Sequence, residues 1–215
     1  MIDRLGYFAA WGLTWVGVAY AAVVAVGIAQ AGVDPIVDPV FALMEALTLL
    51  AAVLIVIVLA CLYEYASSGR KLCALIALSF GIVMAGLTSG VHFVALTAGR
   101  QTGLTTLEWP STLYAVELLA WDVFLGLALL FAASVFTGRR SLSSLRWTLT
   151  VTGTLCLVGG IGPLVGDMAL QRVGIVGYGV GLPISSALLA TAFRRRNTLP
   201  PDSSDSARHS VGAPS

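Results

Sequence analysis

Six long apolar segments, separated by short polar connections, run along this chain. They extend over residues 7–31, 40–65, 72–98, 112–136, 147–165 and 174–193. A helix of about 20 residues is long enough to cross a hydrocarbon core of about 30 Å. The pattern therefore predicts an all-α integral membrane protein, folded as a compact bundle of six transmembrane helices.

The connections alternate in charge. Ten of the 12 lysines and arginines fall on one side of the predicted spans, and only Arg100 and Arg172 fall on the other. The ten are Arg4, Arg70, Lys71, Arg139, Arg140, Arg146, Arg194, Arg195, Arg196 and Arg208. Because positively charged connections stay in the cytoplasm, both termini are predicted to be cytoplasmic, which agrees with an even number of spans. The opposite side carries the acidic residues Asp34, Asp38, Glu108 and Asp167.

One membrane domain, residues 1–196, is predicted, followed at residues 197–215 by a polar stretch that we expect to be a disordered cytoplasmic tail. Only 11% of the residues are charged and the net charge is +1, so neither a soluble domain nor nucleic-acid binding is indicated. The composition is typical of a bacterial protein, which predicts a plasma-membrane location. The cysteines Cys61, Cys73 and Cys156 are scattered, and we expect no disulfide.

Small residues line one face of the third segment and one face of the sixth. The two faces comprise Gly81, Ala85, Thr88, Ser89 and His92, and Gly174, Gly177, Gly181 and Ser185. Because small side chains let helices approach closely in a membrane, tight packing is predicted at both faces, and the face of the sixth segment could also pair two subunits into a homo-oligomer. Kinks or local openings are predicted at Gly159, Gly160, Gly162, Pro163 and Pro183.

A weak internal similarity relates the second and third segments to the fourth and fifth. Glu45 and Glu117 lie near the starts of the second and fourth segments, and these segments are followed by Gly-Arg-Lys at 69–71 and Gly-Arg-Arg at 138–140. Duplicated helical hairpins are one interpretation. Chance similarity between apolar helices is the other.

Four ionisable residues lie inside the predicted spans, where a charged side chain costs about 2.5 to 3.5 kcal/mol. Glu45, His92 and Glu117 are expected about 10 Å inside the non-cytoplasmic ends of three helices, and Asp122 near the midplane. If these faces meet, they form one polar pocket. Asp122 is rotated by about 140° from Glu117, so the two carboxylates are expected to have different neighbours. All four are candidate catalytic residues, the alternative being that they only join helices.

Further candidates concern substrate binding. Trp121, Tyr114 and Tyr178 could line a pocket and attract positive charge with their ring faces, although core packing is the alternative interpretation. Thr88 and Ser89, one turn before His92, are polar candidates for the same role. Because there is one histidine in the spans and no ligand-spaced motif, neither a metal site nor a cofactor is predicted.

These residues predict a membrane-embedded enzyme that acts on a lipophilic substrate, an isoprenoid or a lipid, by acid/base chemistry as a cyclase, isomerase or transferase. Asp122 or Glu117 would deliver a proton, and His92 would accept or relay one. The alternative is a proton- or cation-coupled transporter, or the substrate-binding subunit of a transporter. A third interpretation is a scaffold whose buried polar groups only join helices. The expected partners are a lipophilic small molecule and membrane lipid.

Overall fold

The apolar segments form helices in the computed structural model, which describes residues 2–32, 36–102 and 109–198. Within these ranges the chain is helical and contains no strand. Six helices are long and apolar enough to cross a membrane, as predicted. They are Ile2–Ala31, Val40–Tyr65, Ser68–Gly99, Thr112–Val135, Arg140–Val165 and Met168–Arg195.

The first two helices are continuous, and the other four are composite. The continuous ones are α1 (Ile2–Ala31) and α2 (Val40–Tyr65). The third helix consists of η1 (Ser68–Arg70), α3 (Lys71–Val94), η2 (Ala95–Gly99) and α4 (Arg100–Thr102). The fourth consists of α5 (Thr112–Leu118), η3 (Leu119–Leu125) and α6 (Gly126–Val135). The fifth consists of η4 (Arg140–Leu142), α7 (Ser143–Gly159) and α8 (Ile161–Val165), and the sixth of α9 (Met168–Val176), η5 (Gly177–Gly181) and α10 (Leu182–Thr198).

Three of the short segments, η2, η3 and η5, are π-helical. A π-helical turn has hydrogen bonds from i to i+5, so it changes the angular position of every side chain that follows it, and such turns are frequent at functional sites. The segment η3 contains Asp122 and η5 contains Tyr178, while η2 begins three residues after His92. The third, fourth and sixth helices each carry a predicted site residue in or near a π-helical turn. Side chains beyond these turns therefore do not follow the positions of a regular helical wheel.

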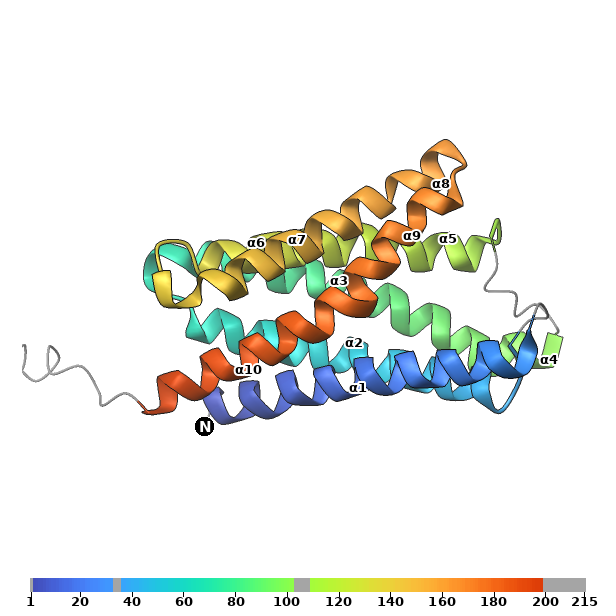
Figure 1. Ribbon diagram of the computed structural model, residues 1–215, viewed down its shortest axis with the longest axis horizontal. Helices are drawn as coiled ribbons and strands as arrows, with labels where there is room; N and C mark the ends of the chain where they lie inside the picture. Colours follow the sequence, from blue (N-terminus) through green and yellow to red (C-terminus); the bar gives the residue numbers. More distant parts are fainter. Residues whose placement is uncertain (1, 33–35, 103–108, 199–215) are drawn as a thin grey trace, which may run out of the picture.

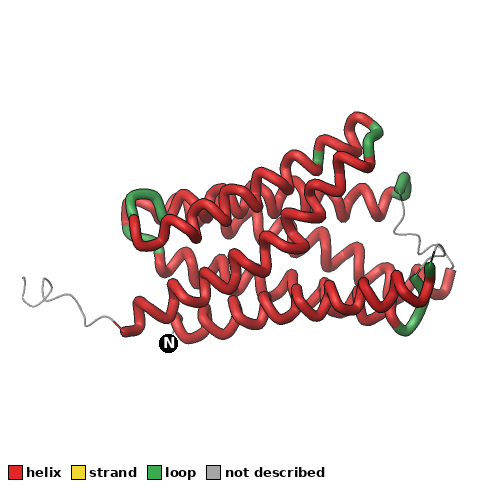
Figure 2. The backbone as a smooth tube through the Cα atoms, in the orientation of Figure 1, coloured by secondary structure: helices red, strands yellow, loops and turns green. Residues whose placement is uncertain are grey.

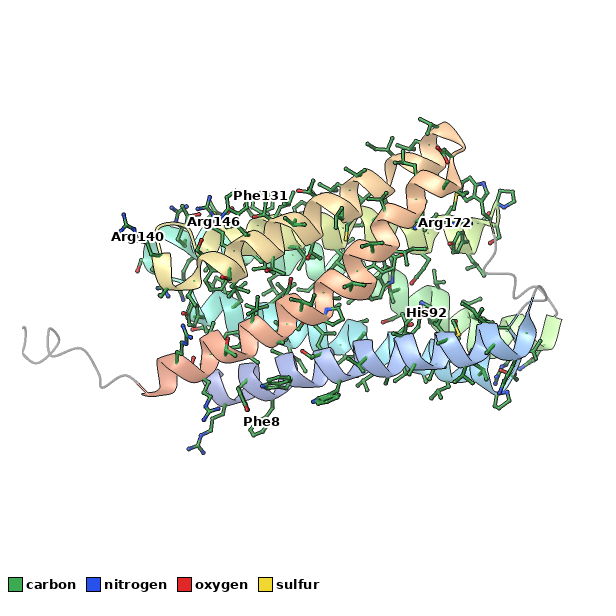
Figure 3. All side chains as sticks on the ribbon, viewed as in Figure 1. Phe8, His92, Phe131, Arg140, Arg146 and Arg172 are labelled. Atoms are coloured by element: carbon green, nitrogen blue, oxygen red, sulfur yellow. The ribbon has the colours of Figure 1, made fainter. Side chains whose placement is uncertain are left out.

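The six helices form a closed ring. Each packs against the next one in the sequence, and α10 returns to pack against α1 (Figure 1). Both ends of the described chain lie at the same end of the bundle, which we call the terminal end (Figure 2). Figure 3 shows Arg140 and Arg146 at this end and Arg172 at the opposite one. The alternation of charge along the sequence thus corresponds to two differently charged ends of the bundle.

Aromatic side chains fill the bundle near the terminal end. The ring of Tyr65 lies 5.9 Å from the ring of Phe136 and 5.7 Å from that of Phe193, centroid to centroid. The Arg139 guanidinium lies over the Tyr65 ring, and its Nη1 donates a hydrogen bond of 2.9 Å to the Tyr65 hydroxyl. Because Phe136 and Phe193 are almost completely buried, this half of the bundle is a packed core.

The fifth and sixth helices pack closely through small residues. A Cβ atom on Gly159 would lie 2.5 Å from the backbone of Gly174, so neither position has room for a larger residue. Farther along, Gly181 faces Thr152, and the Thr152 hydroxyl lies 3.4 Å from the hydroxyl of Ser185. The small-residue face predicted for the sixth helix is therefore an internal packing surface against α7.

The bounds of the last two helices differ from those expected. The sixth begins at Met168 instead of 174, and Asp167 caps it by accepting hydrogen bonds from the backbone N–H groups of Ala169 and Leu170. The polar Gln171 and Arg172 concealed this start because they interrupt the apolar run. The fifth begins before Trp147, at η4 and α7, and is interrupted between α7 and α8 within the predicted glycine cluster.

The carboxyl-terminal boundary also differs slightly. The helix α10 continues to Thr198, two residues into the stretch expected to form the tail. The rest of that predicted tail, together with Asp34 and Glu108, lies outside the described residues.

Candidate functional site

A cavity of about 1350 Å³ lies in the half of the bundle remote from the terminal end. Its wall is built from one face of α1, the first half of α2, the end of the third helix, α5 with η3, and α9 with η5. Most lining residues are apolar, and a few polar side chains converge on the same space. Apolar cavities with a small number of placed polar groups are typical of small-molecule sites.

Three ionisable side chains meet at the wall of this cavity, and we call them the Glu–His–Glu cluster. Nδ1 of His92 lies 2.5 Å from Oε2 of Glu45, and Nε2 of His92 lies 2.7 Å from Oε1 of Glu117. The side chains of His92 and Glu45 are 6% and 4% exposed, and that of Glu117 is 13% exposed. The imidazole, labelled in Figure 3, therefore bridges one buried and one largely buried carboxyl group.

The position of each member follows from its helix. Glu45 and Glu117 are each the sixth residue of their helices, α2 and α5, and His92 lies in the last turn of α3. The hydroxyl of Ser111 accepts a hydrogen bond of 3.2 Å from the backbone N–H of Tyr114, which caps α5 and determines where Glu117 lies along it. The sequence predicts that these three residues lie at a similar depth in the bundle, and in the structure their side chains meet there.

The cluster can share and transfer protons. A neutral imidazole donates through one nitrogen and accepts through the other, whereas an imidazolium donates through both. Because both nitrogens of His92 face carboxyl oxygens, a proton can move between Glu45 and Glu117 through the ring. The remaining oxygen of Glu117, Oε2, is buried and has no hydrogen-bond partner among the described residues. This oxygen is an unpartnered acceptor of the cluster.

Aromatic side chains form another part of the cavity wall. The rings of Trp121 and Tyr178 lie 5.4 Å apart with an interplanar angle of 54°. Tyr114 and Tyr20 also line the cavity. Ring faces attract positive charge, so this wall can stabilise a cationic group or a developing positive charge. All three aromatic residues predicted to bind substrate are therefore at the cavity.

Asp122 belongs to a second buried cluster. The Nε2 group of Gln171 donates hydrogen bonds of 3.3 Å to Oδ2 of Asp122 and 3.3 Å to the hydroxyl of Tyr178. Asp122 is completely buried and is not among the residues that line the cavity. As predicted, it and Glu117 have different neighbours. Among the described residues, hydrogen bonds connect Asp122 to the cavity through Gln171 and Tyr178.

Thr88 and Ser89 are also absent from the lining of the cavity. Thr88 is completely buried, and its hydroxyl donates to Sδ of Met84 at 3.8 Å within the same helix. The structure thus places these two predicted substrate-binding residues on α3, the helix that carries His92, and outside the lining of the cavity.

Sequence reasoning did not single out several residues of the site. Gln171 lies in a stretch expected to be a connection, and Tyr20 on α1 has no polar neighbour pattern that predicts a site, although the lining residues of α1 recur at helical spacing on one face. At the mouth, Nη2 of Arg100 donates a hydrogen bond of 2.5 Å to Oδ2 of Asp38. Since these side chains are 39% and 52% exposed, the pair contributes little stability.

Metal-ligating residues are not grouped in the described part of the chain. No set of three or more His, Cys, Asp or Glu side chains there is arranged to hold a metal ion. Cys61, Cys73 and Cys156 are free thiols.

The fold and site together define a class: a ring of six helices, each long and apolar enough to cross a membrane, around an apolar cavity that contains a Glu–His–Glu cluster. No protein-family model, curated protein or solved structure matches this chain. Its function must therefore be inferred from the chemistry of its own residues.

Proposed function

We propose that this chain is a membrane-embedded enzyme that acts on a lipophilic substrate, an isoprenoid or a lipid, by acid/base chemistry. The observation that carries the proposal is the imidazole of His92, held between Glu45 and Glu117 at the wall of a large apolar cavity. General acid/base catalysis needs a proton donor or acceptor within reach of the reacting atom and a route for the proton. The cluster supplies both.

Each residue has a distinct role in this proposal. Glu117, which lines the cavity, exchanges a proton with the substrate, and His92 relays that proton to or from Glu45. Trp121 and Tyr178 stabilise positive charge that develops on the substrate. Because Asp122 does not line the cavity, we assign it a positioning role: it holds the Gln171 amide, which in turn holds the Tyr178 hydroxyl.

The arrangement of the helices supports entry from the side of the bundle. The first helix packs along α10, whereas α9 leans onto α7 and diverges from α1 (Figure 1). Ile175, Val176 and Val180 line the cavity and are also exposed at the surface of the bundle. In a membrane, these residues would face lipid. A lipophilic molecule could therefore enter between α1 and α9 without crossing an aqueous phase.

The proposal includes membrane insertion with both termini in the cytoplasm, supported by the arginines at the terminal end. Single cysteines at the exposed positions Ser141 and Val165, introduced into a chain whose native cysteines are replaced by alanine, test it. In intact cells an impermeant maleimide should label Val165→Cys, and it should label Ser141→Cys only after lysis. The reverse pattern would require the opposite orientation, and equal labelling of both in intact cells would contradict insertion.

The acid/base chemistry can be tested by following the transfer of deuterium from solvent to a substrate. An unfractionated lipid mixture serves as the source of substrate. Purified protein is incubated with membrane lipid extract in D2O, and lipids that gain non-exchangeable deuterium are identified by mass spectrometry. We expect incorporation by the wild type and a decrease of at least about 100-fold in Glu117→Gln, since loss of a general acid or base typically costs 10²–10⁴-fold.

The matched control is Glu64→Gln, the same change at a side chain that is 47% exposed and lies outside the cavity. It should incorporate deuterium like the wild type. Undiminished incorporation by a folded Glu117→Gln variant would exclude Glu117 as the acid/base group, and the absence of any incorporation by the wild type would contradict the enzymatic proposal.

One observation favours a second candidate, a proton- or cation-coupled transporter or the substrate-binding subunit of one. The cavity lies in one half of the bundle, and the other half is closed by the packed aromatic residues Tyr65, Phe136 and Phe193. This is the geometry expected of a single access state in alternating access. For this function, the same cluster would bind the coupling proton or cation.

A further inference from the structure

The charge of the Glu–His–Glu cluster is constrained by its two short contacts. If His92 is an imidazolium, it donates to both Glu45 and Glu117, and −2 from the carboxylates plus +1 from the ring leaves −1. If the ring is neutral, one nitrogen must accept from a protonated carboxyl group, and one carboxylate remains, which again leaves −1. With two protons shared among the three side chains, both arrangements that satisfy the contacts therefore carry one net negative charge.

The described surroundings do not offset this charge. Arg100 is the other cationic residue among the described residues of the lining, and its charge is paired with Asp38. The remaining titratable groups that face the cavity are the phenols Tyr20, Tyr114 and Tyr178, which supply no positive charge. Behind Tyr178 lies Asp122, which can only add negative charge.

An unbalanced charge in an apolar surrounding is costly, so the cluster favours a neutralising partner. A third proton is one such partner, and a cationic ligand is the other. Oε2 of Glu117 can hold that proton, because it is buried without a hydrogen-bond partner in the described structure. The Glu117 side chain also lines the cavity, so a cationic ligand there lies close to the charge of its carboxylate.

The aromatic wall favours the same charge. The paired rings of Trp121 and Tyr178 line the cavity together with the cluster. A cation between ring faces and a carboxylate is attracted by both, and each aromatic contact contributes about 0.5 to 2 kcal/mol. An anion would be repelled by both. The apolar remainder of the lining accommodates hydrocarbon groups attached to the cationic centre.

We propose that the cavity binds a lipophilic cation, such as an amine or quaternary ammonium compound with hydrocarbon substituents, in exchange for a proton. The inference rests on the proposed function, whose substrate class it narrows. As the cation enters, the third proton leaves Oε2 of Glu117 for water, and no covalent bond other than O–H changes. Affinity for a permanent cation rises tenfold per pH unit over the range in which the empty site holds that proton.

Tetraphenylphosphonium, a permanent lipophilic cation, tests the inference, with tetraphenylborate as an anion of the same shape. Binding to the detergent-purified full chain is measured by calorimetry at several pH values and in two buffers of different ionisation enthalpy, which gives the number of protons released. We expect one proton released per phosphonium bound and at least about thirtyfold weaker binding in Glu117→Gln, the usual effect of removing one partner of a buried charge pair. Glu64→Gln should bind like the wild type.

A second variant and three contrary outcomes complete the test of phosphonium binding. Trp121→Leu should weaken phosphonium binding about two- to thirtyfold, as expected for loss of a cation–aromatic contact. Equal binding of phosphonium and borate, phosphonium binding without proton release, or no phosphonium binding at all overturns the inference. The deuterium experiment is independent: incorporation of deuterium that persists without phosphonium binding leaves the enzymatic proposal in place and rejects only the cationic substrate.

Discussion

His92→Phe is expected to lower the free energy of unfolding by about 3 to 5 kcal/mol, the usual cost of breaking a buried ion pair by removing one partner. The phenyl ring has a similar shape to imidazole, so the loss comes from Glu45 and Glu117, which remain buried without the group that separates and bridges them. Titration of the folded protein with sodium dodecyl sulfate in mixed micelles, followed by tryptophan fluorescence, measures the change.

The control for this prediction replaces the whole cluster. In the triple variant His92→Phe, Glu45→Met and Glu117→Met no buried charge remains, and most of the lost stability should return, since replacing all partners by apolar groups is often nearly neutral. Deuterium incorporation should be absent from both variants. A His92→Phe protein as stable as the wild type would show that the three side chains are not in contact in the folded protein.

Gly159→Ala is expected to destabilise the bundle by about 1 to 3 kcal/mol, the usual cost of overpacking a close contact. A Cβ atom there would lie 2.5 Å from Cα and N of Gly174, which are backbone atoms and cannot move away without separating the fifth and sixth helices. Separation would also move Gln171, one turn before Gly174, from Asp122. The same unfolding titration measures the loss.

Two sets of variants separate the steric clash at Gly159 from the general effect of replacing a helical glycine by alanine. Gly86 and Gly90 have open space where a Cβ would be placed, so Gly86→Ala and Gly90→Ala should be neutral or more stable by up to about 1 kcal/mol through helix propensity. At Gly174 the nearest atom to a new Cβ is a carboxylate oxygen of Asp122. Asp122→Ala should therefore partly rescue Gly174→Ala but not Gly159→Ala, which a double-mutant cycle detects. Equal costs at Gly86 and Gly159 would rule out a close helix crossing.

The number and approximate bounds of the long helices could be predicted because both depend on local sequence. The second helix was expected at 40–65 and is α2, Val40–Tyr65. The start of the sixth helix could not be predicted from apolarity, because Gln171 is buried through its contacts with Asp122 and Tyr178. Asp122 is 49 positions away in the sequence, and Tyr178 lies seven residues farther along the same helix, so the residues next to Gln171 do not distinguish it from a residue in a polar connection.

The candidate site could be predicted in part. Depth along a helix follows from counting residues, and it correctly grouped Glu45, His92 and Glu117. Depth along a helix does not predict which side chains face the cavity. Thr88 and Asp122 lie outside its lining. The catalytic and substrate-binding roles of all these residues remain predictions.

By itself, the sequence determined that this protein consists of six long apolar helices with positive charge concentrated toward one end, because hydropathy, length and charge are properties of short segments. Only the tertiary structure decided which polar groups meet. The two contacts of His92 join residues 47 and 25 positions apart, and they depend on how the second, third and fourth helices cross. The close approach of Gly159 to Gly174 likewise depends on two helices that pack without intervening side chains.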